Sequence, residues 1–307
     1  MRKPLNIFIL IFFGGFFVFC GFVRAMTSTN YRVNWDSINS GGLDIATSTN
    51  YNLHDTIGEQ ATGYTTSSNY TLSAGYRTGD KDETYLTFRI GTQEPDSAVS
   101  YSVFDNVGIS VTVSSASGFS VGDIIGVVED VGLSQLIAIG KITDITGTVI
   151  TVDKWDGVPG SLSLNPGGGD DFVYRINGNS VAFGTLTNSI AKTSLTGTRV
   201  TSNAVNGYTV YVNTDDDLRY GTTNLQNVSD GAVTIGSEEY GWQTYGSSAT
   251  STGSDHAFTT LPQEIQYSTT TASIEERVGL VYKISISNST PAGNYSQSVF
   301  YTLTANY

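Results

Sequence analysis

The chain has 307 residues and a formal net charge of −13, with 14% of its residues charged and 39% apolar. The apolar share excludes wholesale disorder, and the acidic balance, with no basic patch in the sequence, excludes nucleic-acid binding. Glycine is abundant at 34 residues, Ser, Thr, Asn and Tyr are frequent, and good helix formers are scarce, which predicts an all-β protein of about two domains.

Residues 1–25 are predicted to be a signal peptide. A basic start at Arg2 and Lys3 precedes an apolar run, and Val23 and Ala25 occupy the −3 and −1 positions of a small-residue cleavage site. The rest of the chain is then exported by the Sec route to the cell surface or the extracellular medium. An uncleaved anchor is the alternative, and the only expected membrane contact, because the apolar run is close to a bilayer span in length.

The mature chain is predicted to lack cysteine, since Cys20 is the single cysteine and lies inside the signal segment. It therefore has no disulfide, no thiol nucleophile and no cysteine metal site. It also carries 28 acidic and 12 basic side chains, because the first 25 residues hold three bases and no acid. Such an exported chain relies on large β cores, calcium, side-chain crosslinks or assembly.

Residues 26–80 contain an internal repeat. The segment Thr-Ser-Thr-Asn-Tyr at 27–31 recurs at 47–51, and a Thr-Ser-Ser-Asn-Tyr copy follows at 66–70, at spacings of 20 and 19 residues. Each copy offers a polar turn that ends in Asn, and then a short alternating stretch led by Tyr. The resulting strands either form a small meander packed on a neighbouring domain or pair with another subunit.

Residues 81–91 hold a charged link and the first strand of a sandwich, in which Leu86, Phe88 and Ile90 alternate. Residues 92–170 are predicted to be a small β-barrel inserted after that strand, because their strands are short and regularly punctuated by glycines such as Gly140 and Gly147.

Residues 171–307 are predicted to form a C-terminal β-sandwich. Alternation at 208–213 and at 280–286 gives each strand one buried and one exposed face, and residues 299–305 form the final strand. No stretch shows helical periodicity. The expected architecture is a Greek-key sandwich, immunoglobulin-like or jelly-roll, of about seven to nine strands.

Several of these segments resemble known sequences. The Ser/Thr-Asn-Tyr repeats before Ser73–Tyr76 resemble the N-terminal part of uncharacterised exported surface proteins of small-genome uncultured bacteria from the candidate phyla. The C-terminal unit resembles theirs at 181–186, 201–208, 239–241 and 290–295. More loosely, this unit is similar to WxL, spore-coat and fimbrial β-sandwich domains. The resemblance implies a structural or adhesive role at the cell surface, and it brings no catalytic residues.

Two departures limit what the resemblance implies. The 92–170 unit looks like an insertion, so whatever role it has is specific to the subgroup to which this chain belongs and is not implied by the resemblance. No Trp-x-Leu motif is present, so peptidoglycan binding of the WxL kind does not carry over.

No cofactor is expected, with calcium as the alternative. Asp215, Asp216 and Asp217 cluster in one loop after a strand, and hard oxygen ligands on flexible loops suit Ca²⁺. A second acidic group lies in the linker at 80–83. Neither has the spacing of the twelve-residue calcium loop.

An isopeptide crosslink, Lys–Asn or Lys–Asp, is a further hypothesis that follows from the absence of cysteine. Lys283 is placed opposite the apolar face of its strand and Asn306 ends the last strand, so these two residues are the candidates. A lysine that protects a strand edge against aggregation is the alternative.

Aromatic residues raise a binding hypothesis. Trp35, Trp155 and Trp242, together with 18 tyrosines, are the kind of side chain that stacks on sugar rings or forms interfaces. Packing inside the β cores is the alternative that the sequence leaves open.

Catalysis is not expected. Surface positions in polar loops account for the two histidines, His54 and His256. The adjacent carboxylates at 170–171, 215–217 and 238–239 are of the type used by glycosidases. All three groups lie in turn-like contexts, where solvated charge is the ordinary role.

The sequence thus predicts a non-enzymatic structural protein of the cell surface, an assembly subunit of the envelope or of an appendage. Its expected partners are itself or other surface proteins, through strand pairing. The alternatives are a monomeric adhesin or glycan-binding module that contacts a cell-surface glycan and, more distantly, a carbohydrate-active enzyme.

Overall fold

The computed structural model describes residues 46–47, 52–53, 63–66, 71–74 and 85–306. The chain divides into two compact units, Met1–Glu83 and Thr84–Tyr307. The described residues form β-strands and two short 3₁₀ turns, η2 (Pro95–Ser97) and η3 (Pro159–Ser161), so the expected all-β class is confirmed. In this part of the chain no helix is long and apolar enough to span a membrane. The predicted signal peptide lies outside it.

The described part of the first unit consists of two short hairpins. β1 (Ala46–Thr47) pairs with β2 (Asn52–Leu53), and β3 (Gly63–Thr66) pairs with β4 (Thr71–Ala74), both antiparallel. In the sequence, the second and third Asn-Tyr copies stand between the two strands of each pair. The first copy lies outside the described residues.

The second unit contains one large antiparallel sheet of eleven strands and a separate sheet of three strands. Its strands in chain order are β5 (Leu86–Gln93), β6 (Val99–Asp105), β7 (Ser110–Val113), β8 (Ile124–Glu129), β9 (Leu136–Thr146), β10 (Val149–Val152), β11 (Asp156–Gly157), β12 (Phe172–Gly178), β13 (Lys192–Ser202), β14 (Tyr208–Thr214), β15 (Arg219–Tyr220), β16 (Thr223–Asn224), β17 (Glu239–Tyr245), β18 (Gln263–Ser268), β19 (Ser273–Ser285) and β20 (Val299–Ala305).

Six strands of the large sheet close on themselves. β12 pairs with both β6 and β8, so the pairing runs β8-β9-β10-β7-β6-β12 and returns to β8. We call this closed circuit the barrel. Its interior is filled by apolar side chains, among them Phe104, Val111, Ile125 and Ile150, each at most 1% exposed. β12 therefore belongs to the circuit, although the sequence placed residues from 171 onward in the C-terminal unit.

β9 runs without a break through Gly140, where the sequence suggested a division between two strands. An added Cβ at Gly140 would lie 2.8 Å from the Cβ of Val152 on β10. The glycine thus permits close packing of β10 on β9 and does not mark a turn.

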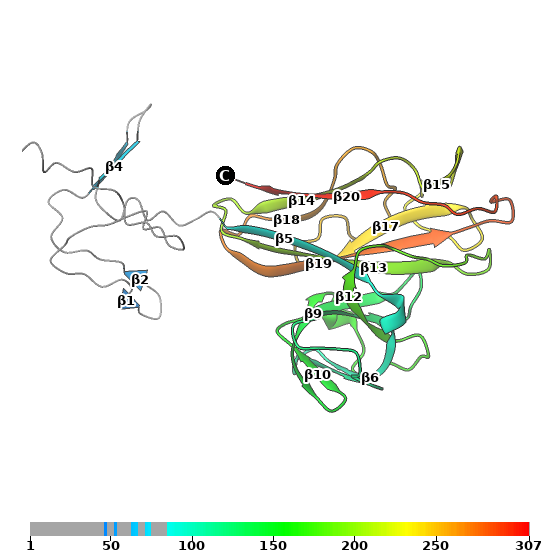
Figure 1. The fold of residues 1–307 in the computed structure, drawn as a ribbon, viewed down its shortest axis with the longest axis horizontal. Coiled ribbons are helices and arrows are strands. Elements are labelled where there is room, and N and C mark those ends of the chain that lie inside the picture. Colours follow the sequence, from blue (N-terminus) through cyan, green and yellow to red (C-terminus); the bar gives the residue numbers. More distant parts are fainter. Residues whose placement is uncertain (1–45, 48–51, 54–62, 67–70, 75–84, 307) are drawn as a thin grey trace, which may run out of the picture. The chain divides into compact units, whose positions relative to one another are not determined.

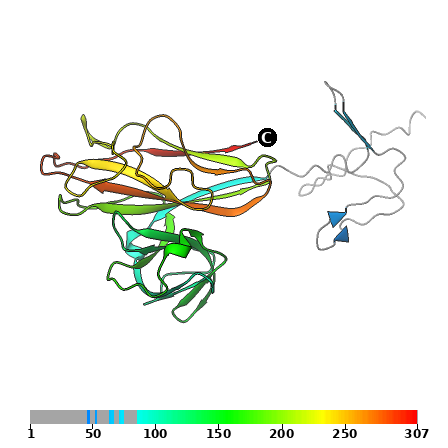
Figure 2. The ribbon, with the colours of Figure 1, turned by 180° about the vertical axis from the view of Figure 1, so that it is seen from behind.

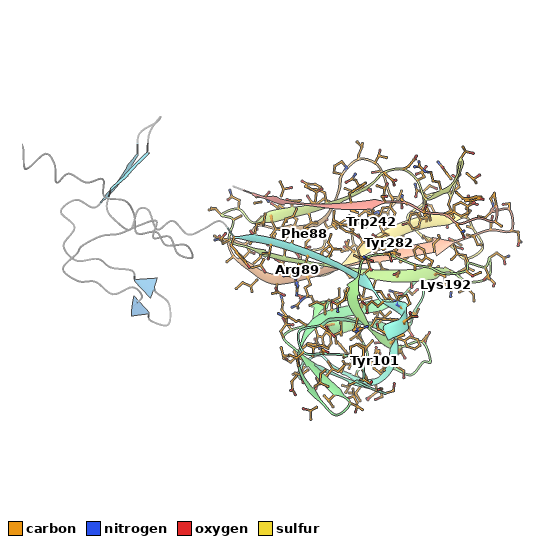
Figure 3. The ribbon with its side chains drawn as sticks, viewed as in Figure 1. Phe88, Arg89, Tyr101, Lys192, Trp242 and Tyr282 are labelled. Carbon is orange, nitrogen blue, oxygen red and sulfur yellow. The ribbon has the colours of Figure 1, made fainter. Side chains whose placement is uncertain are left out.

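The remaining long strands form two layers around a second core, which we call the two-layer body. One layer is β5-β13-β19-β17 and the other is β18-β14-β20. Trp242, Tyr208, Phe258 and Tyr282 lie buried between them, as the labelled Trp242 and Tyr282 show in Figure 3. From β13 to β20, each long strand lies in the layer opposite to the one before it.

The barrel interrupts the chain between β5 and β13, which nevertheless pair with each other. The barrel packs against the outer face of the β13–β19 layer. It lies below the body in Figure 1 and also in the reverse view of Figure 2. Ile137 and Ile139 of β9 contact Leu195 and Val281 there. Gly279 of β19 makes this approach possible, because a Cβ at that position would overlap the side chain of Ile137.

Arg277 of β19 ties the barrel to the body. Its side chain is 1% exposed, with Nη2 at 2.5 Å from Asp153 Oδ2 and Nη1 at 3.1 Å from Asp156 Oδ2. Burial acts to raise the pKa of Asp153, but the Arg277 guanidinium and two backbone N–H donors hold it below its ordinary value. Burial prevails at Asp156 and raises its pKa, despite the charges of Lys154 and Arg277.

The expectation that β19 exposes alternate residues is wrong. Leu280 and Tyr282 face the core between the layers, while Val281 faces the barrel and Lys283 is only 4% exposed. The second face is covered by the barrel and by residues from distant loops. The alternating pattern of the strand itself does not indicate that distant segments bury its second face.

Candidate functional site

One side of the two-layer body is closed by residues 248–256. Thr244 N–H of β17 donates to Ser251 O at 2.9 Å, and Tyr267 N–H of β18 donates to Ser248 O at 2.9 Å. This segment therefore covers the outer edges of β17 and β18. The opposite side of the body ends at β5 in one layer and at β20 in the other.

β20 is an edge strand that, in the part of the chain described, pairs with β14 alone. Asp215 N–H donates to Ser298 O at the start of this ladder. Because backbone groups alternate in direction along an antiparallel strand, residues 299, 301, 303 and 305 point their N–H and C=O groups away from β14. We call this row the β20 edge.

The side chains of β20 leave this edge unprotected. Its seven residues, Val-Phe-Tyr-Thr-Leu-Thr-Ala, include no charge and no proline, the features with which edge strands usually discourage pairing with another chain. Val299, Tyr301 and Leu303 contact the core between the layers but remain only half-buried. A further strand docked here would satisfy the free backbone groups and complete the cover of this core.

β5 has a shorter open edge on the same side of the body. It pairs with β13 along its length, but with β12 only at Thr92 and Gln93. Phe88, labelled in Figure 3, contacts the core between the layers, while Leu86 and Ile90 are 37% and 42% exposed. The two layers thus end in the strands β5 and β20, neither of which is covered by residues 248–256. β5 carries the exposed charge of Arg89, whereas β20 carries none.

Tyr301 anchors β20 to the opposite layer. Its hydroxyl oxygen lies 2.6 Å from that of Tyr282 on β19. Burial raises the pKa of Tyr282 to about 12 and that of Tyr301 well above its ordinary value. Both hydroxyls are therefore neutral at physiological pH, and this hydrogen bond holds the edge strand in place.

Three carboxylates gather on the barrel, those of Asp130, Asp170 and Asp171, with one oxygen of each within 4.8 Å of the others. Asp171 is buried and accepts N–H donors from Asp130 and Gly168, each at 3.1 Å. Partial desolvation and the neighbouring carboxylates raise the pKa of Asp130. Such oxygen donors are of the kind that Ca²⁺ takes. The sequence singled out 170–171 only as a possible catalytic pair.

The carboxylates of Asp215, Asp216 and Asp217 face three different partners. Asp215 Oδ1 accepts the Ser298 N–H at 2.8 Å, Asp216 pairs with Arg219, and Asp217 Oδ1 accepts from Asn227 at 2.7 Å. These contacts fasten the loop to the residues before β20 and after β16. Calcium at this triplet stays a prediction.

The other possible catalytic groups also have local partners. Glu238 Oε2 accepts from the Thr290 hydroxyl at 2.5 Å, and Glu239 Oε2 accepts the Thr234 N–H at 2.6 Å. His256 lies against the ring of Trp242, with ring centroids 5.1 Å apart. His54 lies outside the described residues.

Two of the three tryptophans are inside cores. Trp155 is 9% exposed and packs on Phe104 in the barrel, and Trp242 is fully buried in the body, where its Nε1–H donates to Ala257 O at 3.2 Å. Both rings take the packing role that the sequence left open as the alternative to sugar binding. Trp35 lies outside the described residues.

Lys283 and Asn306, the predicted crosslink pair, have different neighbours. Lys283 Nζ lies 2.7 Å from Asp255 Oδ1, and the Asn306 amide donates to the Thr209 hydroxyl of β14 at 3.3 Å. Among the described residues no contact joins Lys283 to Asn306. Sequence reasoning missed Asp255, because a single aspartate in the polar loop Gly253–His256 gives no signal of burial.

Comparison of the chain with protein-family models, with curated proteins and with solved structures gives no match.

Proposed function

We propose that this protein is an exported, non-enzymatic subunit of a cell-surface structure that assembles by strand pairing at the β20 edge. The observation that carries the proposal is the row of outward N–H and C=O groups on β20, in a strand without charge or proline. Extended segments add to exposed sheet edges through such main-chain bonds, and alternate side chains then fill the pockets beside them. The half-buried Val299, Tyr301 and Leu303 border such a pocket.

The incoming strand belongs to residues 26–80 of a second copy. Two-stranded hairpins of the size of β1–β2 and β3–β4 are marginally stable by themselves and gain from adding to a larger sheet. The alternating stretches led by Tyr in that segment match the period of a strand. A chain whose mature part has no cysteine gains its extracellular stability from such assembly.

The fold supports the same proposal. We assign the two-layer body to the Greek-key β-sandwiches, because its long strands from β13 to β20 alternate between layers around one core. Export by the Sec route, with cleavage after Ala25, completes the proposed role.

A matched pair of variants tests the β20 edge. Leu303→Pro and Leu303→Ala both remove the half-buried leucine side chain, but only the proline removes the outward N–H and blocks an incoming strand. We expect both to fold, and we expect Leu303→Ala to assemble while Leu303→Pro stays monomeric. Light scattering and negative-stain microscopy measure assembly, and circular dichroism checks the fold.

Assembly of Leu303→Pro at the level of Leu303→Ala would reject pairing at β20. Deleting residues 26–80 tests the incoming strand separately, because the truncated chain should fold but fail to assemble. A parent protein that is a clean monomer, with and without calcium, would reject assembly as such.

One observation favours a glycan-binding module as the second candidate. Tyr220 is 52% exposed and its ring lies 6.2 Å from that of Tyr295, so two aromatic rings meet at the surface beside the β15–β16 turn. Exposed aromatic faces of this kind stack on sugars. Saturable binding to a defined glycan, lost in Tyr220→Ala and kept in the matched variant Tyr267→Ala, would support this candidate.

A further inference from the structure

A buried lysine and a buried aspartate lie in contact on the side of the two-layer body that residues 248–256 close. Lys283 projects from β19 and Asp255 belongs to residues 248–256, and their side chains are 5% and 7% exposed. Nζ lies 2.7 Å from Asp255 Oδ1. The approach does not have hydrogen-bond geometry, and Oδ1 accepts no hydrogen bond from any of the described residues.

Two further contacts orient these groups. Lys283 Nζ donates to Gln243 Oε1 at 3.0 Å, and the same oxygen also accepts from the Tyr245 hydroxyl at 2.9 Å. An amine whose N–H is held by Gln243 keeps its lone pair free to face the carboxyl carbon of Asp255. The other carboxyl oxygen, Oδ2, accepts the Val233 N–H at 2.8 Å.

We propose that Lys283 and Asp255 condense to an intramolecular amide crosslink. One ammonium proton passes from Nζ to Oδ1, and the neutral amine then forms the Nζ–Cγ bond. The negative charge that develops on Oδ2 is stabilised by the Val233 N–H, as by a donor of an oxyanion hole. A second proton passes from Nζ to Oδ1, the Cγ–Oδ1 bond breaks, and one water molecule leaves. Charge and atoms balance without an external reactant.

The buried position favours this condensation over an ordinary ion pair. Well-oriented intramolecular groups reach effective molarities of about 10⁵–10⁸ M, and the 2.7 Å between Nζ and Oδ1 places the amine beside the carboxyl group of Asp255. The desolvation cost of a buried ion pair also opposes keeping two charges there, and the amide removes both. Water that leaves such a place does not readily return to hydrolyse the bond.

The crosslink would fasten the segment that closes one side of the body to its central strand. It differs from the pair predicted from the sequence, because Asp255 replaces Asn306. It is also independent of the proposed assembly, since Lys283 and Asp255 lie away from the β20 edge. Failure of either proposal leaves the other standing.

Mass spectrometry of the purified full chain tests the crosslink directly. After its N-terminus has been determined, the denatured parent should be lighter than its sequence by one water molecule. Trypsin should yield no peptide ending at Lys283 and should release a branched peptide that contains Asp255. Lys283→Arg and Asp255→Ala should each restore the sequence mass. Lys192→Ala, at the exposed lysine labelled in Figure 3, should keep the deficit.

A parent mass equal to the sequence mass, with an ordinary peptide ending at Lys283, would overturn the proposal. This result does not depend on any variant, so a failure of Asp255→Ala to fold leaves the experiment decisive. A mass deficit that survives in Lys283→Arg would equally overturn it, because the lost water would then come from elsewhere in the chain.

Discussion

The barrel and the two-layer body are built from the same kind of strand but end differently. Both enclose a core of buried apolar side chains. The circuit of the barrel returns to β8, whereas the layers of the body stop at β5 and β20. Closure removes strand edges and with them the hazard of pairing with another chain. Among the described residues, therefore, the barrel is protected from strand addition, whereas the two-layer body ends in strands whose outer edges are unpaired.

This difference bears on function because the β20 edge lacks the usual protections of an edge strand. β20 has neither charge nor proline, and the loop at 248–256 covers only the far side of the body. A monomer of such a sequence carries an aggregation hazard at β20. A subunit that pairs with a second copy uses the same feature for assembly.

The largest expected effect on the free energy of unfolding comes from removing Arg277, which joins the barrel to the two-layer body. Arg277→Ala removes the buried guanidinium that pairs with Asp156 and Asp153, whose side chains are 10% and 29% exposed. Loss of a partner buried in this way should cost about 3–5 kcal/mol of unfolding free energy. Lys154→Ala is the matched control, because Lys154 pairs with the same Asp156 at 3.4 Å but is 42% exposed. Its cost should stay below about 1 kcal/mol. Urea unfolding of both variants measures the difference.

Equal effects of Arg277→Ala and Lys154→Ala would show that the barrel is held by apolar contacts alone. Acid gives an independent check. The pKa of Asp153 is lowered in the folded state, so its contribution to stability is present above the ordinary aspartate pKa. This contribution is lost as the pH falls through the lower folded value, and Arg277→Ala should remove that part of the acid sensitivity.

The next largest effect is a loss of stability of the two-layer body at alkaline pH. Tyr282 has its pKa raised to about 12 by burial, against an ordinary value of 10. A raised folded pKa means that the stabilisation is complete below pH 10 and is lost as the pH rises toward 12, by about 3 kcal/mol in all. Tyr282→Phe should cost a hydrogen bond at neutral pH but flatten this decline. Phenolate absorbance and circular dichroism follow it, and an unchanged slope in the variant would contradict the assignment.

Much of the fold could be predicted from the sequence, because short alternating stretches between glycines determine strands. The all-β class is confirmed, and Tyr208–Val212 and Leu280–Ile284 do supply the apolar side chains between the layers. The continuity of β9 could not be predicted, because a glycine in the sequence can either end a strand or, as Gly140 does, leave room for a side chain of the next strand, here Val152. The second buried face of β19 was missed because its cover comes from distant segments.

The candidate sites were harder to predict than the fold. The terminal strand was a candidate for pairing from its apolar alternation, but only the register with β14 reveals which of its backbone groups point outward. Lys283 was a candidate from its place in the strand, whereas Asp255 reaches it through a loop closure that spacing does not encode. The acidic cluster joins Asp130 to 170–171 across 40 residues for the same reason.

The smallest expected effect concerns the acidic cluster on the barrel, in which the carboxylates of Asp130, Asp170 and Asp171 lie close together. Asp130 is exposed, has a positive φ of 56°, and has its pKa raised by partial desolvation and by the carboxylates of Asp170 and Asp171. Asparagine tolerates this backbone conformation and carries no charge. Asp130→Asn should therefore give a small rise in melting temperature at neutral pH.

The sign of this effect is fixed by the raised pKa of Asp130. The folded state disfavours the ionised form of this side chain, so the penalty is present at neutral pH and vanishes below the ordinary aspartate pKa, where both states are protonated. The gain in Asp130→Asn should accordingly fade in acid and in high salt, which screens exposed charges. Calorimetry with and without calcium decides the matter. A bound cation would reverse the result, because calcium would then stabilise the parent more than the variant and the three carboxylates would act as ligands instead of mutually repelling charges.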